Sequence, residues 1–131
     1  MKIAVDFDGT IVEHKYPAIG KVMPFAFETL KMLQDKEHQL ILWTYRSGPY
    51  LDEAVEFCRE NGIEFYAVNA SYPGETMDDS KSRKIDCDCY IDDRNIGGLI
   101  SWGEIYHILH PEDGHSHLEK PAKKKKPFWK R

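Results

Sequence analysis

An apolar run that ends in two aspartates constrains the fold of this chain more than any other feature. The run covers residues 2–8, is apolar apart from Lys2, Asp6 and Asp8, and is closed by Gly9. A short, nearly continuous apolar run is typical of a strand buried on both faces of a parallel sheet. Side chains two residues apart on a strand point the same way, so we expect both aspartates to emerge together at its carboxyl end.

Three further segments show strand patterns, and helical patterns lie between them. The expected strands are residues 2–8, 39–44, 64–69 and 87–92, and the expected helices are residues 24–37, 50–61 and 102–110. Residues 14–23 are expected to form a loop or short hairpin, and residues 70–80 a loop. Strands that alternate with helices predict an α/β fold with a three-layer, doubly wound, Rossmann-like and mainly parallel sheet.

Charge divides the chain into two unequal parts. Residues 120–131 carry seven of the 18 basic residues and no acid, whereas residues 1–119 carry 11 basic and 22 acidic residues, a net charge of -11. The acidic residues 1–119 are expected to bind cations, and the basic tail of residues 120–131 to attract anions. Residues 111–131 lack periodicity and are predicted to be disordered, which leaves residues 1–110 as one domain. No apolar window is long enough to span a membrane, so a cytoplasmic location is expected.

Several polar residues stand at the ends of the expected strands. Thr44 ends the second strand, and Asp92 and Asp93 end the fourth. In open α/β sheets, ligands bind at the carboxyl ends of parallel strands, so these residues should meet Asp6 and Asp8 at one edge. Two carboxylates about 4 Å apart repel each other by about 4 kcal/mol at an effective dielectric constant of about 20. Such a cluster needs a divalent cation, and oxygen ligands favour Mg²⁺.

These features together resemble a known family. The run from Asp6 to Thr10, which reads Asp-Phe-Asp-Gly-Thr after a strand, resembles the signature of the haloacid dehalogenase-like (HAD) phosphatase superfamily. Thr44, a lysine before the fourth strand and the Asp92-Asp93 pair match its later motifs. The resemblance extends over residues 1–110 and implies a HAD-like fold.

The resemblance implies roles for the matching residues. Asp6 would attack phosphorus, while Asp8 would protonate the leaving oxygen and then deprotonate the hydrolytic water. Mg²⁺ would lie between Asp6, the Asp8 backbone carbonyl and Asp92, assisted by Asp93.

Other residues would hold the phosphoryl group. Thr44 and a lysine would bind its oxygens, and the Gly9-Thr10 turn would let backbone amides approach it. Arg46 and Ser47 are further candidates for substrate binding.

The identity of the lysine is open between Lys81 and Lys84. Eight extended residues from Lys84 to Asp92 would span about 26 Å and place Lys84 at the far end of the sheet. Lys81, nearer the loop after the third strand, is therefore the preferred candidate.

The position of Asp8 favours a phosphatase over a dehalogenase, because only an ester's leaving alcohol needs a proton. The segments between residues 12 and 25 and between residues 69 and 87 are too short for a cap domain, so an open site is expected. An open site suits a macromolecular substrate or a homo-oligomer whose neighbour serves as a lid.

Three alternatives remain. The basic tail, with Phe128 and Trp129, suggests a phosphatase that acts on nucleic-acid ends. A phosphoacceptor domain like a response-regulator receiver uses similar residues, although its acidic pair follows the first strand. A binding protein on an inactive catalytic fold is the third alternative.

Overall fold

Four short strands form one parallel sheet in the computed structural model, which describes residues 1–113. The strands are β1 (Lys2–Val5), β2 (Gln39–Leu42), β3 (Ala67–Val68) and β4 (Cys89–Ile91). They lie in the order β3-β2-β1-β4, so β1 pairs with both β2 and β4. Val5 is aligned with Leu42 on one side and Ile91 on the other, which brings the carboxyl ends of three strands level.

Three helices and a short 3-10 turn complete the architecture. The helices are α1 (Ala26–Asp35), α2 (Gly48–Glu60) and α3 (Trp102–Leu109), and η1 (Pro111–Asp113) follows them. The Ser101 side chain accepts a hydrogen bond from the Glu104 amide at the start of α3, as the capping-box spacing predicts. Gly62, with φ of 86°, ends α2, because a residue without Cβ adopts this conformation at little cost.

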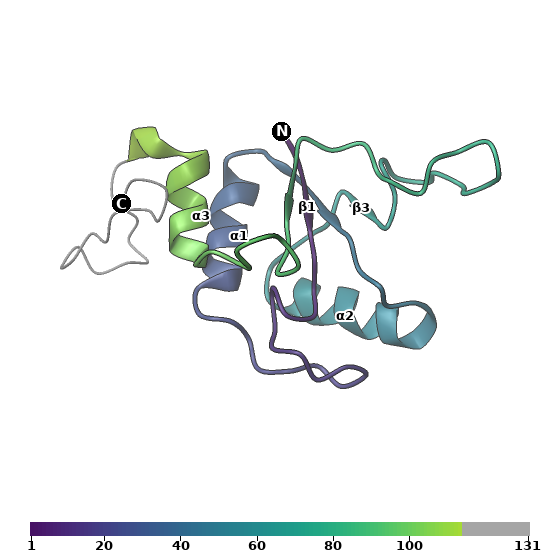
Figure 1. Cartoon of the computed structure of the whole chain (residues 1–131), viewed down its shortest axis with the longest axis horizontal. Coiled ribbons are helices and arrows are strands. Elements are labelled where there is room, and N and C mark those ends of the chain that lie inside the picture. The colour runs from purple at the N-terminus through teal and green to yellow at the C-terminus, as the bar shows by residue number, and fades with distance from the viewer. Residues whose placement is uncertain (114–131) are drawn as a thin grey trace.

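One face of the sheet packs against all three helices. Ile3 and Val5 are fully buried in a core that draws residues from every helix, including Leu30, Cys58 and Ile105. In Figure 1, α1 and α3 lie side by side to the left of β1, and α2 lies lower in the view, below β1 and β3. This core fixes β1 at the centre of the molecule.

Within residues 1–113, no helix covers the other face of the sheet. Ala4 and Ile41 form a smaller cluster with Ala67 and with Ile85, which lies in the connection from β3 to β4. This connection, residues 69–88, is irregular throughout and extends beyond β3 in Figure 1. The doubly wound arrangement predicts a helical layer here, but the sequence of this connection has no helical periodicity to form one.

The sequence predicts most of this organisation. The α/β class and the parallel sheet are confirmed, and each helix begins and ends within two residues of its expected bounds. The strands are shorter than expected: β1 and β2 end at Val5 and Leu42, and β3 and β4 begin only at Ala67 and Cys89. Residues 111–113 form η1, whereas disorder was expected there, and the rest of the predicted tail lies outside the described residues. Within residues 1–113, no helix combines the length and apolarity that crossing a bilayer requires.

A short hairpin leaves β1 and leads to α1. Val12 pairs with Val22 in an antiparallel bridge, and the Glu13 amide donates to the Lys21 carbonyl at 2.8 Å. Residues 14–23 therefore form the hairpin that the sequence analysis allowed. It lies below β1 in Figure 1, beyond the carboxyl ends of the strands.

Candidate active site

Asp6 stands between the ends of β1 and β4. Its amide donates to the Ile91 carbonyl at 3.0 Å, which extends the pairing of the two strands by one residue. Asp92 and Asp93 follow Ile91 directly, so the parallel register brings three carboxylates to one edge of the sheet. Each of Asp6, Asp92 and Asp93 offers an oxygen within 4.8 Å of the others.

This acidic cluster changes the ionisation of its members. Burial raises the pKa of Asp6 to about 7, and the charges of Asp92 and Asp93 add to the rise, although a hydrogen bond from Thr10 opposes it. Burial also acts to raise the pKa of Asp93, but hydrogen bonds with His14 and Asp6 hold that pKa below its ordinary value. Without a cation, the proton of this cluster therefore resides on Asp6.

Thr10 connects the first and fourth strand ends. Its buried hydroxyl donates to Asp6 Oδ2 at 2.9 Å and to Asp93 Oδ1 at 3.3 Å. The same oxygen accepts a hydrogen bond from the Asp93 amide at 3.0 Å. The hydroxyl is thus committed to the two carboxylates. The Thr10 amide donates to the Phe7 carbonyl and the Gly9 amide to the Val12 carbonyl, so both amides are bonded within the turn.

Two side chains approach the backbone at Gly9 too closely for a residue that carries a Cβ. It has φ of 86°, and a Cβ there would lie 2.2 Å from His14 Nε2 and 2.4 Å from Asp93 Oδ2. Those two side chains meet over Gly9 with 2.9 Å between the same atoms. No pattern in the sequence indicates His14, because its pairing with Asp93 depends on the path of the hairpin.

A pocket of about 480 Å³ opens beside Asp6. Its walls combine two carboxylates with polar, aromatic and thioether groups: Asp6, Asp92, Thr44, Asn69, Arg83, Trp43, Tyr45 and Met77. The residues come from the ends of β1, β2, β3 and β4 and from the connection between β3 and β4. The pocket therefore lies at the carboxyl ends of the strands, where the sequence predicts a site, while Arg83 and Met77 come from a segment without periodicity.

Thr44 is held at the pocket wall by two hydrogen bonds. Its amide donates to Asn69 Oδ1 at 2.8 Å, and its hydroxyl oxygen accepts from the Arg46 amide at 3.2 Å. A hydroxyl that accepts from a neighbour keeps its own hydrogen for donation. Thr44 is thus placed to donate to an anion in the pocket.

Arg46 faces Asp8. Its Nε and Nη2 lie 2.8 Å from Asp8 Oδ2 and Oδ1, a bidentate pair, and the residue is 1% exposed. The same guanidinium donates to the carbonyls of Pro17, Ala18 and Tyr50. Arg46 therefore ties Asp8 to the hairpin and to α2, a role different from the substrate contact expected for it.

The remaining candidates lie apart from the pocket. Lys81 Nζ donates to the Tyr72 hydroxyl at 3.4 Å, Lys84 is exposed, and Ser47 is the N-cap residue of α2. The chain from Lys84 to Asp92 is not the single extended run that was expected to place Lys84 far from the site, because β4 begins only at Cys89. Arg83, between the two lysines, is the cation that the structure places in the pocket wall.

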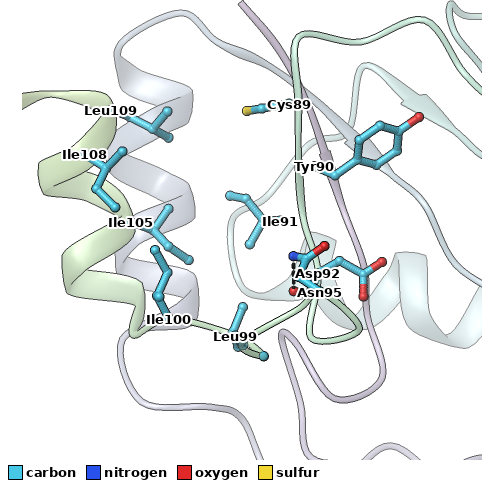
Figure 2. A pocket seen from close by; sticks show the side chains of 11 residues that line it. Cys89, Tyr90, Ile91, Asp92, Asn95, Leu99, Ile100, Ile105, Ile108 and Leu109 are labelled. Carbon is cyan, nitrogen blue, oxygen red and sulfur yellow. Dashed lines mark hydrogen bonds between the residues drawn. The ribbon is translucent and has the colours of Figure 1, made fainter. Parts of the chain in front are cut away.

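A second, smaller pocket lies on the other side of Asp92. It has a volume of about 260 Å³ and is largely aliphatic. Figure 2 shows Ile105, Ile108 and Leu109 reaching from α3 toward Ile91, while the Asp92 carboxylate points away from them. The carboxylates therefore belong to the larger pocket, where a charged ligand would meet them.

One solved structure is closely similar to the chain. It is the structure of a conserved protein coded by a locus of Bacteroides thetaiotaomicron, with 57% sequence identity and a TM-score of 0.80. The match covers 86% of this chain and 91% of that one. No protein-family model and no curated protein matches the chain. The similarity thus establishes kinship and a shared fold, while the description of that protein gives no activity.

Proposed function

We propose that this chain, which belongs to the same family as that conserved Bacteroides thetaiotaomicron protein, is a magnesium-dependent phosphatase that acts through an aspartyl-phosphate on Asp6. One observation carries the proposal: Asp6, Asp92 and Asp93 bring carboxylate oxygens close together, and Asp6 and Asp92 line a pocket that Thr44 and Arg83 also line. Carboxylates together with phosphate-binding groups in one pocket suit phosphoryl transfer, which depends mainly on positioning and charge neutralisation.

The acidic cluster fits a hard divalent cation. Its ligands are carboxylate oxygens, and the pKa of Asp6 is raised to about 7 because burial and two neighbouring charges disfavour its ionised form. Mg²⁺ bound by Asp6, Asp92 and Asp93, with the Asp8 carbonyl as a further ligand, would neutralise charge on the phosphoryl group. Binding of the cation would also favour the ionised, nucleophilic form of Asp6.

The reaction divides into two displacements. The Asp6 carboxylate attacks phosphorus, the bond to the ester oxygen breaks, and Asp8 gives that oxygen its proton. Water then attacks the acyl phosphate, Asp8 takes the proton from it, and inorganic phosphate leaves Asp6 free.

Thr44 and Arg83 are proposed to hold the phosphoryl oxygens. Thr44 has its hydroxyl hydrogen available in the pocket wall, and Arg83 would supply the cation that the sequence leads one to expect from Lys81 or Lys84. A guanidinium can donate two parallel hydrogen bonds to a phosphoryl group.

The ion pair with Arg46 affects how Asp8 can act as the acid and base. Both carboxylate oxygens accept hydrogen bonds from the guanidinium, yet each keeps a second lone pair for a proton. Arg46 is therefore proposed as a positioning residue that fixes the orientation of Asp8.

The finer fold type is proposed to be HAD-like, without a cap domain and with the irregular connection after β3 in place of the second helical layer of a doubly wound sheet. Strand order supports this type over a receiver-like domain. The described strands lie in the order β3-β2-β1-β4, whereas receivers have the order 2-1-3-4-5. The two segments where a cap could be inserted are the hairpin after β1 and the irregular connection after β3.

Other expectations remain proposals. The hypothesis that the basic tail, residues 120–131, binds nucleic acid concerns residues outside those described. A homo-oligomer and a cytoplasmic location likewise remain predictions.

A phosphatase screen tests the proposal. Sugar phosphates, nucleotides and phosphorylated oligonucleotides are offered with Mg²⁺ or with EDTA, and Asp6→Asn serves as the blank. Asp52→Asn, an exposed carboxylate on α2, is the matched control. We expect Mg²⁺-dependent phosphate release by the wild type and the control alone. Equal release by Asp6→Asn would reject the proposal.

A further inference from the structure

Exposed tyrosine rings form a row that leads to the pocket. Tyr45, directly after Thr44, is 93% exposed although it lines the pocket beside Asp6. The Tyr16 ring lies 6.5 Å from the Tyr45 ring and 5.8 Å from the Tyr50 ring, edge to face in both cases. Tyr16 and Tyr50 are themselves about half exposed. Neighbouring exposed aromatic side chains beside a cavity mark a binding surface.

The row rests on a rigid support. The Arg46 guanidinium lies 5.2 Å from the centre of the Tyr16 ring, and Arg46 is itself buried and bound to Asp8. A ring packed on such a cation has little freedom, so Tyr16 gives a fixed edge-to-face neighbour to the Tyr45 and Tyr50 rings.

The pocket has room for more than a phosphoryl group. Its volume of about 480 Å³ lies within the range of about 300–1,000 Å³ for small-molecule sites. Its lining includes two aromatic side chains and a thioether, from Trp43, Tyr45 and Met77. Such a lining suits a flat ring better than a polyhydroxylated sugar, which needs an array of hydrogen-bonding groups.

We infer that the substrate's leaving group carries a nucleobase that stacks on Tyr45 while its phosphoryl group lies at Asp6. Every base has a π-face, and aromatic side chains beside a cation are the usual platform for one. Arg83, in the same pocket wall, supplies that cation. The inference rests on the proposed phosphatase function and names its substrate class.

Two sources share this chemistry, a mononucleotide and the phosphorylated end of a single strand. Tyr45 would stack the terminal base of either. Tyr16 and Tyr50 continue the row, so only a longer strand would use them for a second base.

Selectivity ratios test the inference. Each ratio divides kcat/KM for a base-bearing ester by kcat/KM for glycerol phosphate. The base-bearing ester is either adenosine monophosphate or a short oligonucleotide with a terminal phosphate. We expect Tyr45→Ala to lower this ratio by about tenfold to hundredfold, the effect of losing one stacked base, and Tyr45→Phe to keep it. Tyr50→Ala should lower the ratio for the oligonucleotide alone if a strand is the substrate. Tyr72→Ala, another exposed tyrosine, is the control.

The outcomes separate this inference from the proposed function. If glycerol phosphate is the better substrate, or if Tyr45→Ala slows every substrate equally, the inference is wrong and the phosphatase stands. If no ester is hydrolysed by the wild type, the proposed function fails and the inference with it. Saturable quenching of tryptophan fluorescence by adenosine monophosphate, lost in Tyr45→Ala, would support stacking independently of turnover.

Discussion

Replacing Asp6 by asparagine should stabilise the cation-free fold at alkaline pH. Burial first, and then the charges of Asp92 and Asp93, raise the pKa of Asp6 from 3.8 to about 7. The folded chain therefore holds this proton more tightly than the unfolded chain. The associated stability is fully present below pH 3.8 and is lost as pH rises toward and through about 7.

The size of the effect follows from the pKa. At about 1.4 kcal/mol per pH unit, the full rise corresponds to at most about 4 kcal/mol. Because Asp6 is partly exposed, solvent screening reduces this, and we expect about 2 kcal/mol. Asparagine carries no charge at any pH and escapes the loss.

Denaturant unfolding in EDTA at pH 4.5 and pH 8.5 measures the effect. The free energy of unfolding of Asp6→Asn, relative to the wild type, should rise between the two pH values, whereas that of Asp52→Asn should not. A constant difference for Asp6→Asn would show that Asp6 ionises normally and would refute the reasoning from burial and neighbouring charge.

Three further outcomes follow from the site. Mg²⁺ should raise the melting temperature of the wild type more at pH 8.5 than at pH 5, because it competes with the proton on Asp6. An equal rise of the melting temperature in Asp92→Asn would contradict the proposed cation site. Arg46→Ala should lower the free energy of unfolding in urea by about 3 kcal/mol, since it leaves a largely buried carboxylate unpaired. Arg46→Lys should restore little of it, because lysine cannot form the bidentate pair. In steady-state kinetics, Arg83→Ala should raise KM more than Lys81→Ala or Lys84→Ala does, and the reverse order would return the role to a lysine.

Regular patterns in the sequence account for the sheet and for the acidic edge of the site. Apolar runs locate the strands, and the parallel rule alone brings Asp6 to Asp92 and Thr44. The Ser101 cap and Gly62 similarly fix helix ends. These signals work because they are local or follow from the period of a strand or helix.

Irregular segments account for what the sequence could not predict. Arg46 reaches Asp8 only because of the turn after β2 and the hairpin after β1, and neither path has a periodic signal. Arg83 enters the pocket from residues 69–88, a connection without helix or strand. His14 depends likewise on the hairpin and on the space above Gly9.

A trapped intermediate would test the central claim most directly. Asp8→Asn cannot activate the hydrolytic water, but an ester such as p-nitrophenyl phosphate needs no protonated leaving group, so the first displacement can still occur. After incubation with Mg²⁺ and an acid quench, peptide mass spectrometry should find one phosphoryl group on Asp6 in this variant. A fully phosphate-free Asp6, while p-nitrophenol is released, would contradict covalent catalysis by this residue.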